Sequence, residues 1–391
     1  MTISLPGSPA QAATRTRRQA AARALDFVSR SVSSTGAPSA LLSLDPGFEQ
    51  CFTGARARGI LREHFGVDPG FDLAGEAFSA MVSLTLLPLT AHEADPHLIL
   101  RLATHVKACR WRARYRFFPG SGGFPADTDC TALATAALFE HGLLTQEGLE
   151  RGALELLRSA ALPRDTRRSP DPRDEDRLSR GVFTVYWEDG EEPAALRRGH
   201  KQDEVAAANA LYTLLLAEPD TAQTCAVVEA TTRHLADHLD SGRYLAGTRY
   251  YPSPDAFLYA LSRLCARFPA IAAALAAPAR KALAERDAST MVTVARTPAN
   301  ALETALRTLA ADHLGITTGQ EQRQALLTDT QRLDGSWPPA AYYRMGRFPV
   351  YFGSPYLTTV FAMNALRTHP YARPTERSSV PAAAPRPHSH A

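Results

Sequence analysis

The chain has 391 residues, of which 45% are hydrophobic, and its 43 basic and 40 acidic side chains leave a net charge of +3. This size and composition allow one large core or two ordinary ones. The near balance of charge gives no sign of a nucleic-acid-binding protein. The five cysteines are scattered without CxxC pairs, which is typical of reduced thiols in a cytoplasmic protein and disfavours a disulfide framework or a zinc knuckle.

The two ends of the chain differ in composition from the rest. Residues 1–15 are small and polar, without the apolar segment of a secretory signal, and we expect a loose arm there. Residues 369–391 are rich in Pro, Ala and Ser, which predicts a disordered tail. The uncharged run 80–91 contains Pro88 and is too short to span a bilayer, so only peripheral membrane contact stays open. We therefore expect one folded domain over residues 16–368.

Helical periodicity dominates this domain, and its abundant Ala and Leu are good helix formers. The best strand signal is the short aromatic stretch 181–187. Residues 163–180 carry eleven charged side chains and three prolines, which is typical of a solvated surface loop, with a lid over a site as the alternative. The sequence therefore predicts an all-α chain of about a dozen helices, beginning near residues 18, 39, 73, 95, 129, 146, 203, 222, 254, 269, 299, 319 and 355.

A degenerate repeat runs through the chain, with clear copies starting at Gly120, Arg197, Arg249 and Arg347. Each copy has an aromatic or Gly-rich loop, a helix rich in small residues that Asp, Ser or Pro opens, and then a second, more charged helix. Small residues let helices pack closely, as in an inner ring. Pairs of inner and outer helices repeated about six times predict an (α/α)6 barrel, or toroid. A helical solenoid is the competing architecture, although solenoids usually keep a stricter period.

Two carboxylates, Asp127 and Asp129, open an apolar helix, and the thiol of Cys130 follows them directly. A carboxyl group is normally ionised at pH 7, but burial keeps it protonated, and a second carboxylate nearby resists double ionisation. Such a pair suits an acid that protonates an alkene. The simpler interpretation is that one of the two aspartates only caps the helix, and the two interpretations are compatible.

Two motifs resemble those of known terpenoid cyclases. The segment Gln331–Trp337 fits QxxxGxW and resembles the QW repeat of squalene-hopene and oxidosqualene cyclases, which ties neighbouring outer helices together. The segment Asp127–Ala132 resembles the class II terpene cyclase acid motif: it matches bacterial DxDD at both spaced aspartates, with Cys130 in place of the last one, and the DCTA run of the oxidosqualene cyclases. The resemblance implies an α/α barrel and a protonation-initiated cyclase.

The resemblance also implies roles for residues. Asp129 would deliver the proton, Asp127 would orient it or share it, and Cys130 could hydrogen-bond the acid. His200, in the next repeat, would be the partner that activates Asp129, and the nearby Arg198, Lys201 or Asp203 could serve instead. A surface histidine in a charged loop is the simpler alternative. Because the chain has room for one barrel only, the expected substrate is a hydrophobic, linear isoprenoid of C15 to C20 length, with or without a diphosphate. No cofactor is implied, apart from Mg²⁺ if the substrate is a diphosphate, and the oligomeric state stays open.

Aromatic residues recur in the loops that precede the expected inner helices. Their ring faces can stabilise a carbocation without attacking it, although ordinary packing at the barrel ends is the alternative. The expected substrate-lining rings are Trp111, Tyr115, Trp187, Tyr250, Tyr251, Tyr343, Phe352 and Tyr356.

Charged residues near the acid motif suit a diphosphate. Arg114 and Arg116 alternate with rings just before it, and arginine forks match phosphate oxygens. The acidic turn Glu188–Glu192 could hold Mg²⁺ on a diphosphate. The alternatives are a solvated basic strip and an ordinary acidic turn.

Other functions stay open at this point. A protein prenyltransferase β-like subunit shares the barrel but needs zinc held by Asp, Cys and His, and the adjacent pair Asp129 and Cys130 lacks the intervening residue of that motif. A carbohydrate-active barrel would use paired carboxylates in a polar cleft, which Ala-rich inner helices disfavour. A non-catalytic repeat protein that binds an isoprenoid is the last alternative.

Overall fold

The computed structural model describes residues 9–68, 73, 75–87, 95–120, 123–160, 178–193, 197–218, 221–293, 300–346 and 348–367. Within these ranges the chain is mostly helical, with thirteen α-helices, one short 3₁₀ helix, η1 (Arg243–Ala246), and seven short strands. None of the described helices is long and apolar enough to cross a membrane.

Six helices, here called the inner set, pack against one another in a closed order. Each contacts the next, and the last returns to the first. Their side chains are buried over almost the whole helix surface. This agrees with their sequences, because a helix that is apolar on nearly every face is stable only when it is buried. The inner set is α3 (Phe78–Leu86), α5 (Thr128–Glu140), α7 (Glu204–Ala217), α9 (Pro254–Arg267), α11 (Ala301–His313) and α13 (Pro355–Arg367).

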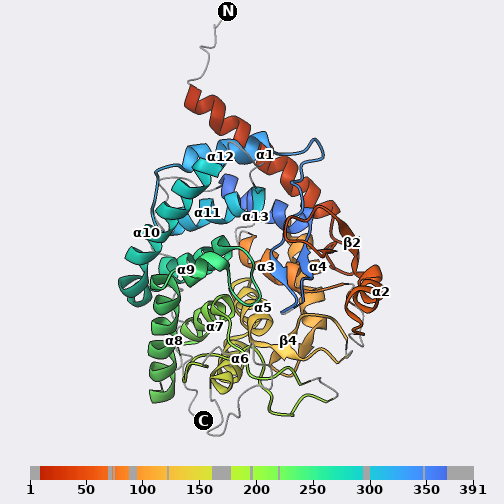
Figure 1. The fold of residues 1–391 in the computed structure, drawn as a ribbon, viewed down its shortest axis with the longest axis vertical. Helices are drawn as coiled ribbons and strands as arrows, with labels where there is room; N and C mark the ends of the chain where they lie inside the picture. The colour runs from red at the N-terminus through yellow and green to blue at the C-terminus, as the bar shows by residue number, and fades with distance from the viewer. Residues whose placement is uncertain are drawn as a thin grey trace, which may run out of the picture.

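Six further helices, the outer set, cover the inner set (Figure 1). Each packs on one or two inner helices: α4 on α3, α6 on α5 and α7, α8 on α7, α10 on α9, α12 on α11 and α13, and α1 on α13. Close approach depends on small residues, since a Cβ on Gly152 of α6 would lie 2.7 Å from Thr135 of α5. The outer set is α1 (Pro9–Arg30), α4 (Pro96–Ala108), α6 (Gln146–Ser159), α8 (Ala222–Asp240), α10 (Pro269–Thr293) and α12 (Gln320–Asp329).

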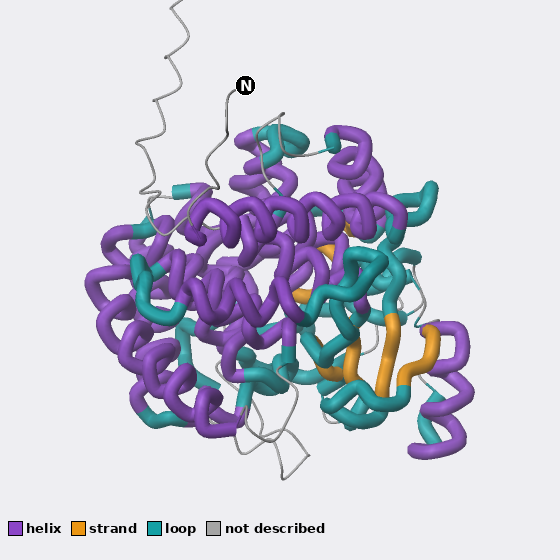
Figure 2. The backbone as a smooth tube through the Cα atoms, turned by 90° about the horizontal axis from the view of Figure 1, so that it is seen from above, coloured by secondary structure: helices purple, strands orange, loops and turns teal. Residues whose placement is uncertain are grey.

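The strands form two small antiparallel sheets that lie on one side of the helices (Figure 2). One has the order β2-β1-β7-β6, the other β3-β4-β5. The second sheet leads directly into α5, because β5 ends at Asp127 and α5 begins at the next residue. Within this sheet Tyr115 of β4 lies opposite Asp127. The strands are β1 (Leu41–Ser43), β2 (Cys51–Thr53), β3 (Arg110–Trp111), β4 (Arg114–Arg116), β5 (Ala126–Asp127), β6 (Tyr343–Arg344) and β7 (Tyr351–Gly353).

The structure differs from the expectations at three places. The helix expected near residue 39 is replaced by β1 and β2, and the next helix, α2, spans Gly54–Phe65. The stretch 181–187 is buried but irregular, because its backbone bonds to Ser159 and Lys201 instead of to a strand. Helix α1 begins at Pro9, so residues 9–15 are helical and not a loose arm. Residues 1–8 and 369–391, and most of the charged loop 163–180, lie outside the described residues.

Candidate active site

Asp129 lies in the first turn of α5 and is only 5% exposed. Its Oδ1 accepts a hydrogen bond from the amide Nδ2 of Asn209, at 2.8 Å, and its Oδ2 accepts one from the hydroxyl of Tyr251. Burial raises the pKa of Asp129 to about 6, although the hydrogen bonds from Tyr251 and Asn209 oppose this shift. The charge of Asp203 raises the pKa further, and that of Arg263 lowers it. Asp129 is therefore a buried carboxyl group that is partly protonated near neutral pH.

Asp127 caps α5, and its Oδ1 accepts a hydrogen bond from the backbone nitrogen of Cys130 at 2.7 Å. Burial raises the pKa of Asp127 to about 7, and the charge of Asp129 adds to this effect. Burial also raises the pKa of the Cys130 thiol well above its ordinary value, and this thiol is hydrogen-bonded to Asp127. The helix cap and the buried pair of carboxyl groups therefore coexist: Asp127 caps the helix, and Asp129 accepts hydrogen bonds from the side chains of Asn209 and Tyr251.

A third carboxylate, Asp203, positions the tyrosine that bonds Asp129. Its Oδ1 caps α7 by accepting from the backbone nitrogens of Val205 and Ala206, at 2.9 and 3.0 Å. Its Oδ2 accepts from the backbone nitrogen of Tyr250 at 2.9 Å. Asp203 is fully buried, and burial raises its pKa. One side chain thus fixes the start of α7 and the Tyr250–Tyr251 segment relative to each other.

Beside the acid pair lies an aromatic cluster, in which the rings contact one another directly. Tyr251 meets Tyr342 and Tyr343 edge-on, with ring centroids 5.4 and 5.6 Å apart. Tyr343 stacks on Tyr250 at 5.6 Å with an interplanar angle of 4°. Such geometries are the favourable ones for aromatic pairs. The aromatic cluster consists of Phe78, Phe117, Phe118, Phe124, Tyr186, Tyr250, Tyr251, Tyr342, Tyr343 and Phe352.

A narrow aromatic cavity opens between these rings, lined among others by Phe117, Tyr250, Tyr343 and Phe352. Its volume is about 10 Å³, which is enough for roughly one water molecule. Arg198 also lines it and places its guanidinium 4.9 Å from the ring centroid of Phe124 and 5.7 Å from that of Tyr186. The rings therefore fill most of the space beside the acid pair.

The structure brings four of the eight expected rings into this cluster: Tyr250, Tyr251, Tyr343 and Phe352. The other four lie elsewhere. Trp111 and Trp187 lie against the guanidinium of Arg114, with centroids 5.4 and 4.3 Å from it. Tyr115 is buried, and its backbone nitrogen donates to the hydroxyl of Thr131 at 2.9 Å, whereas the hydroxyl of Tyr356 donates to Ser83 at 2.9 Å.

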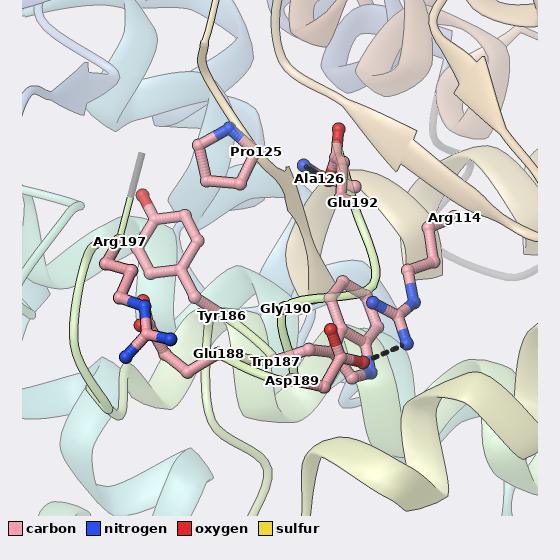
Figure 3. A pocket seen from close by; sticks show the side chains of 10 residues that line it. All are labelled: Arg114, Pro125, Ala126, Tyr186, Trp187, Glu188, Asp189, Gly190, Glu192 and Arg197. Carbon is pink, nitrogen blue, oxygen red and sulfur yellow. Dashed lines mark hydrogen bonds and ion pairs between the residues drawn. The ribbon is translucent and has the colours of Figure 1, made fainter. Parts of the chain in front are cut away.

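The arginines and the acidic turn that were expected to bind a diphosphate and Mg²⁺ pair with each other. Arg114 is 2% exposed and bonds Glu155 at 2.7 Å. It also bonds Asp189 at 2.6 Å (Figure 3). Arg116 pairs with Glu192, whose other oxygen accepts from the backbone nitrogen of Ala126 at 2.8 Å. A pocket of about 160 Å³ lies beside these pairs. Its lining residues Glu188, Asp189 and Glu192 already bond groups within the chain, as Arg114 does, and Asp129 does not line it.

His200, the expected partner of Asp129, is not among the groups that bond this carboxyl in the described part of the chain. The chain supplies Asn209 instead, because α7 begins at Glu204, after His200, and the second turn of α7 faces α5. Sequence reasoning missed Asn209. The available signal was a lone amide within the apolar helix 204–217.

The QxxxGxW segment links neighbouring outer helices. Gln331 donates from Nε2 to the carbonyl of Ala20 in α1 at 2.9 Å. The fully buried Trp337 donates from Nε1 to the carbonyl of Leu327 in α12 at 2.8 Å. Trp187 repeats the second contact on α6, where it donates to the carbonyl of Glu155 at 2.8 Å.

The described residues contain no group of three His, Cys, Asp or Glu side chains that could hold a metal ion.

No family model matches the chain. The drimenol cyclase drtB of Aspergillus calidoustus is 30% identical over 141 residues, which are 36% of this chain and about a quarter of that protein. Among solved structures, a protein from Actinoplanes superposes with a TM-score of 0.59 at 17% identity, over 90% of this chain and 99% of that one. The type II terpene cyclase MstE from Scytonema, in complex with geranylgeranyl dihydroxybenzoate, gives 0.57 at 11% identity, over 91% and 98%. The chain therefore has a class II terpene cyclase-like fold.

Proposed function

We propose that this protein is a class II terpene cyclase, which starts ring closure by protonating an alkene. The observation that carries the proposal is Asp129: a buried carboxyl with two fixed hydrogen-bond donors, next to a cluster of aromatic rings. The fold that the chain shares with MstE supports this proposal, as does the local similarity to a drimenol cyclase. The closed order of inner helices, covered by an outer set, supports an (α/α)6 toroid around this site.

In the proposed reaction Asp129 donates its proton to the terminal C=C of a linear isoprenoid. Desolvation favours the neutral carboxyl, and a donor with a pKa near 6 is partly protonated at neutral pH. The bonds from Asn209 and Tyr251 stabilise the carboxylate that forms as the proton leaves. Asp127, with a pKa of about 7, is the nearest reservoir from which Asp129 can be protonated again.

The carbocation would then face the aromatic cluster, whose rings stabilise positive charge by cation–π attraction until loss of a proton or capture of water ends the cascade. None of these side chains is a strong nucleophile at neutral pH, because burial raises the pKa of Tyr251 and Tyr343 well above the ordinary value. Since the aromatic cavity holds only about 10 Å³, substrate entry requires the rings to move.

The proposed substrate is a C15 to C20 isoprenoid. The solved complex of MstE contains a substrate with a geranylgeranyl group, and 98% of that chain superposes on this one, which supports a substrate of similar length here. Incubation with farnesyl and geranylgeranyl compounds, with and without a diphosphate, tests the proposal by mass spectrometry of the extracts.

The parent protein is expected to give cyclic products, and Asp129→Asn none, with an unchanged circular dichroism spectrum. Asp68→Asn, which alters an ion pair at the surface, serves as the matched control and should retain full turnover. Equal cyclisation by Asp129→Asn and the parent would show that the acid is assigned wrongly.

A further inference from the structure

The arginines of this chain fall into two groups by charge compensation. Before the acid motif, Arg112, Arg114 and Arg116 pair with carboxylates, whereas Arg110 bonds a backbone carbonyl. By contrast, Arg243 and Arg344 have no carboxylate within ion-pair distance among the described residues; they bond the hydroxyl of Ser241 and backbone carbonyls, respectively. Uncompensated guanidinium groups in a concave site are free to bind an external anion.

Both uncompensated arginines line one cleft, here called the arginine cleft, together with Arg249. Its volume is about 390 Å³. Glu204 also lines it and supplies one negative charge, which the charges of Arg243 and Arg344 together exceed. Burial lowers the pKa of His238, another lining residue, to about 4, so this imidazole is neutral at pH 7.

Arg344 is held in place before any ligand arrives. Its Nε donates to the carbonyl of Arg249 at 2.6 Å, its Nη2 donates to that of Thr248 at 2.9 Å, and its backbone nitrogen donates to that of Tyr250 at 2.8 Å. A group fixed in this way loses little conformational entropy when it binds an anion.

The arginine cleft adjoins the aromatic cavity, because Gly346 lines both. Successive residues of a strand point to opposite faces, and in β6 Tyr343 lines the aromatic cavity while Arg344 lines the cleft. Arg198, at the cavity itself, also lacks a carboxylate partner in the described part of the chain. These guanidinium groups would repel a carbocation. The end of the substrate that lies beside them is therefore the end that Asp129 does not protonate.

We propose that the arginine cleft binds the anionic head group of an isoprenoid substrate, while the hydrocarbon tail extends through the aromatic cavity to Asp129. The head group is a diphosphate or a carboxylate, and both have the oxygen geometry that guanidinium forks recognise. This inference rests on the proposed function, because it assigns the two ends of the same substrate.

Binding measured by calorimetry in EDTA, in the Asp129→Asn background that blocks turnover, tests the cleft separately from the chemistry. Farnesyl diphosphate and farnesoic acid supply the two anionic head groups, and farnesol is the neutral analogue. At least one anionic ligand should bind ~10-fold or more tightly than farnesol, and which of the two it is identifies the head group. If farnesol binds as tightly as both, the inference is overturned.

In the same Asp129→Asn background, Arg344→Gln should weaken binding of the preferred anionic ligand ~10-fold or more. Arg243→Gln should weaken it by a smaller factor, and neither substitution should change the affinity for farnesol. Arg112→Gln is the matched control, since Arg112 pairs with Glu191 outside the cleft. Arg243 is exposed, so its replacement should leave the fold intact even if Arg344→Gln destabilises it. Unchanged anion affinity in both variants would refute the cleft. Selective anion binding by a parent protein that forms no cyclic product would refute the proposed function alone.

Discussion

The amide of Asn209 bridges Asp129 and Arg263. Its Nδ2 donates to Oδ1 of Asp129 at 2.8 Å, and its Oδ1 lies 3.5 Å from Nη1 of Arg263. The Arg263 guanidinium in turn lies 4.1 Å from the ring centroid of Tyr212. Because a guanidinium can only donate hydrogen bonds, it selects the orientation in which the amide oxygen faces Arg263 and the amide nitrogen faces the acid.

Replacing Asn209 by Asp keeps the shape of the side chain and removes the donor to Asp129. The new carboxylate should compete with Asp129 for one proton and raise its pKa, so that proton transfer becomes less favourable. We expect turnover to fall about 100-fold, measured as cyclic product per enzyme with the melting temperature as a check on folding. A well-folded Asn209→Asp variant with parental turnover would show that this hydrogen bond has no part in catalysis.

Replacing Arg263 by Gln removes the positive charge that lowers the pKa of Asp129. The pKa should therefore rise, and the high-pH limb of the pH–rate profile should move to higher pH, while the maximal rate falls ~10-fold because the Asn209 amide can turn around. Other groups also interact electrostatically with the acid pair and stay unchanged in this variant: Cys130, Tyr186, Asp203, Tyr251, Tyr342 and Tyr343.

Arg267→Gln is the control for this variant, because Arg267 lies one turn later in α9 against Phe268. It should leave the profile where it is. A lower rate in Arg263→Gln with no displacement of the profile would indicate a merely structural role for Arg263.

The sequence predicted the helix pairs, and the place of two aspartates at the start of an inner helix, because both depend on local patterns. Alternating small and apolar residues mark inner helices, and Asp127 and Asp129 are adjacent to the helix that they open. It could not predict the partners of Arg114 and Arg116, because these depend on a turn about 75 residues away that folds back onto β4. For the same reason Asn209, 80 residues from Asp129, was not recognised as its partner.

The raised pKa values of Asp127 and Asp129 also predict how stability depends on pH. Their ordinary pKa is near 4, and their folded values are about 7 and 6. The folded protein therefore holds more protons than the unfolded chain between about pH 4 and 7, so these groups lower the free energy of unfolding as pH rises through that window. The melting temperature of Asp129→Asn should be close to that of the parent at pH 4.5 and higher than that of the parent at pH 8. A constant difference across this range, measured by calorimetry, would contradict the raised pKa of Asp129.

Tyr343 separates the effect of an aromatic face from that of a filled volume. Tyr343→Phe keeps the ring that stacks on Tyr250 and should cyclise at nearly the parental rate. Tyr343→Leu loses the π-face and should lower turnover ~10-fold and release partly cyclised products, because the cation is less well stabilised. Product analysis by mass spectrometry distinguishes the two variants. Identical product mixtures from both would mean that the ring face is not used.

Gly335, in the QxxxGxW segment, approaches α1 more closely than any side chain would allow. Its φ is +90°, and a Cβ there would lie 2.4 Å from the carbonyl oxygen of Arg23. Gly335→Ala should therefore lower the free energy of unfolding by about 2 to 4 kcal/mol, from backbone strain plus the displacement of α1. Gly315→Ala is the matched control: its φ is +69°, but no atom lies within 4 Å of the added Cβ, so only the left-handed backbone costs about 1 kcal/mol. Urea unfolding of both variants measures the difference. Equal losses would mean that the contact between α1 and this loop does not contribute to stability.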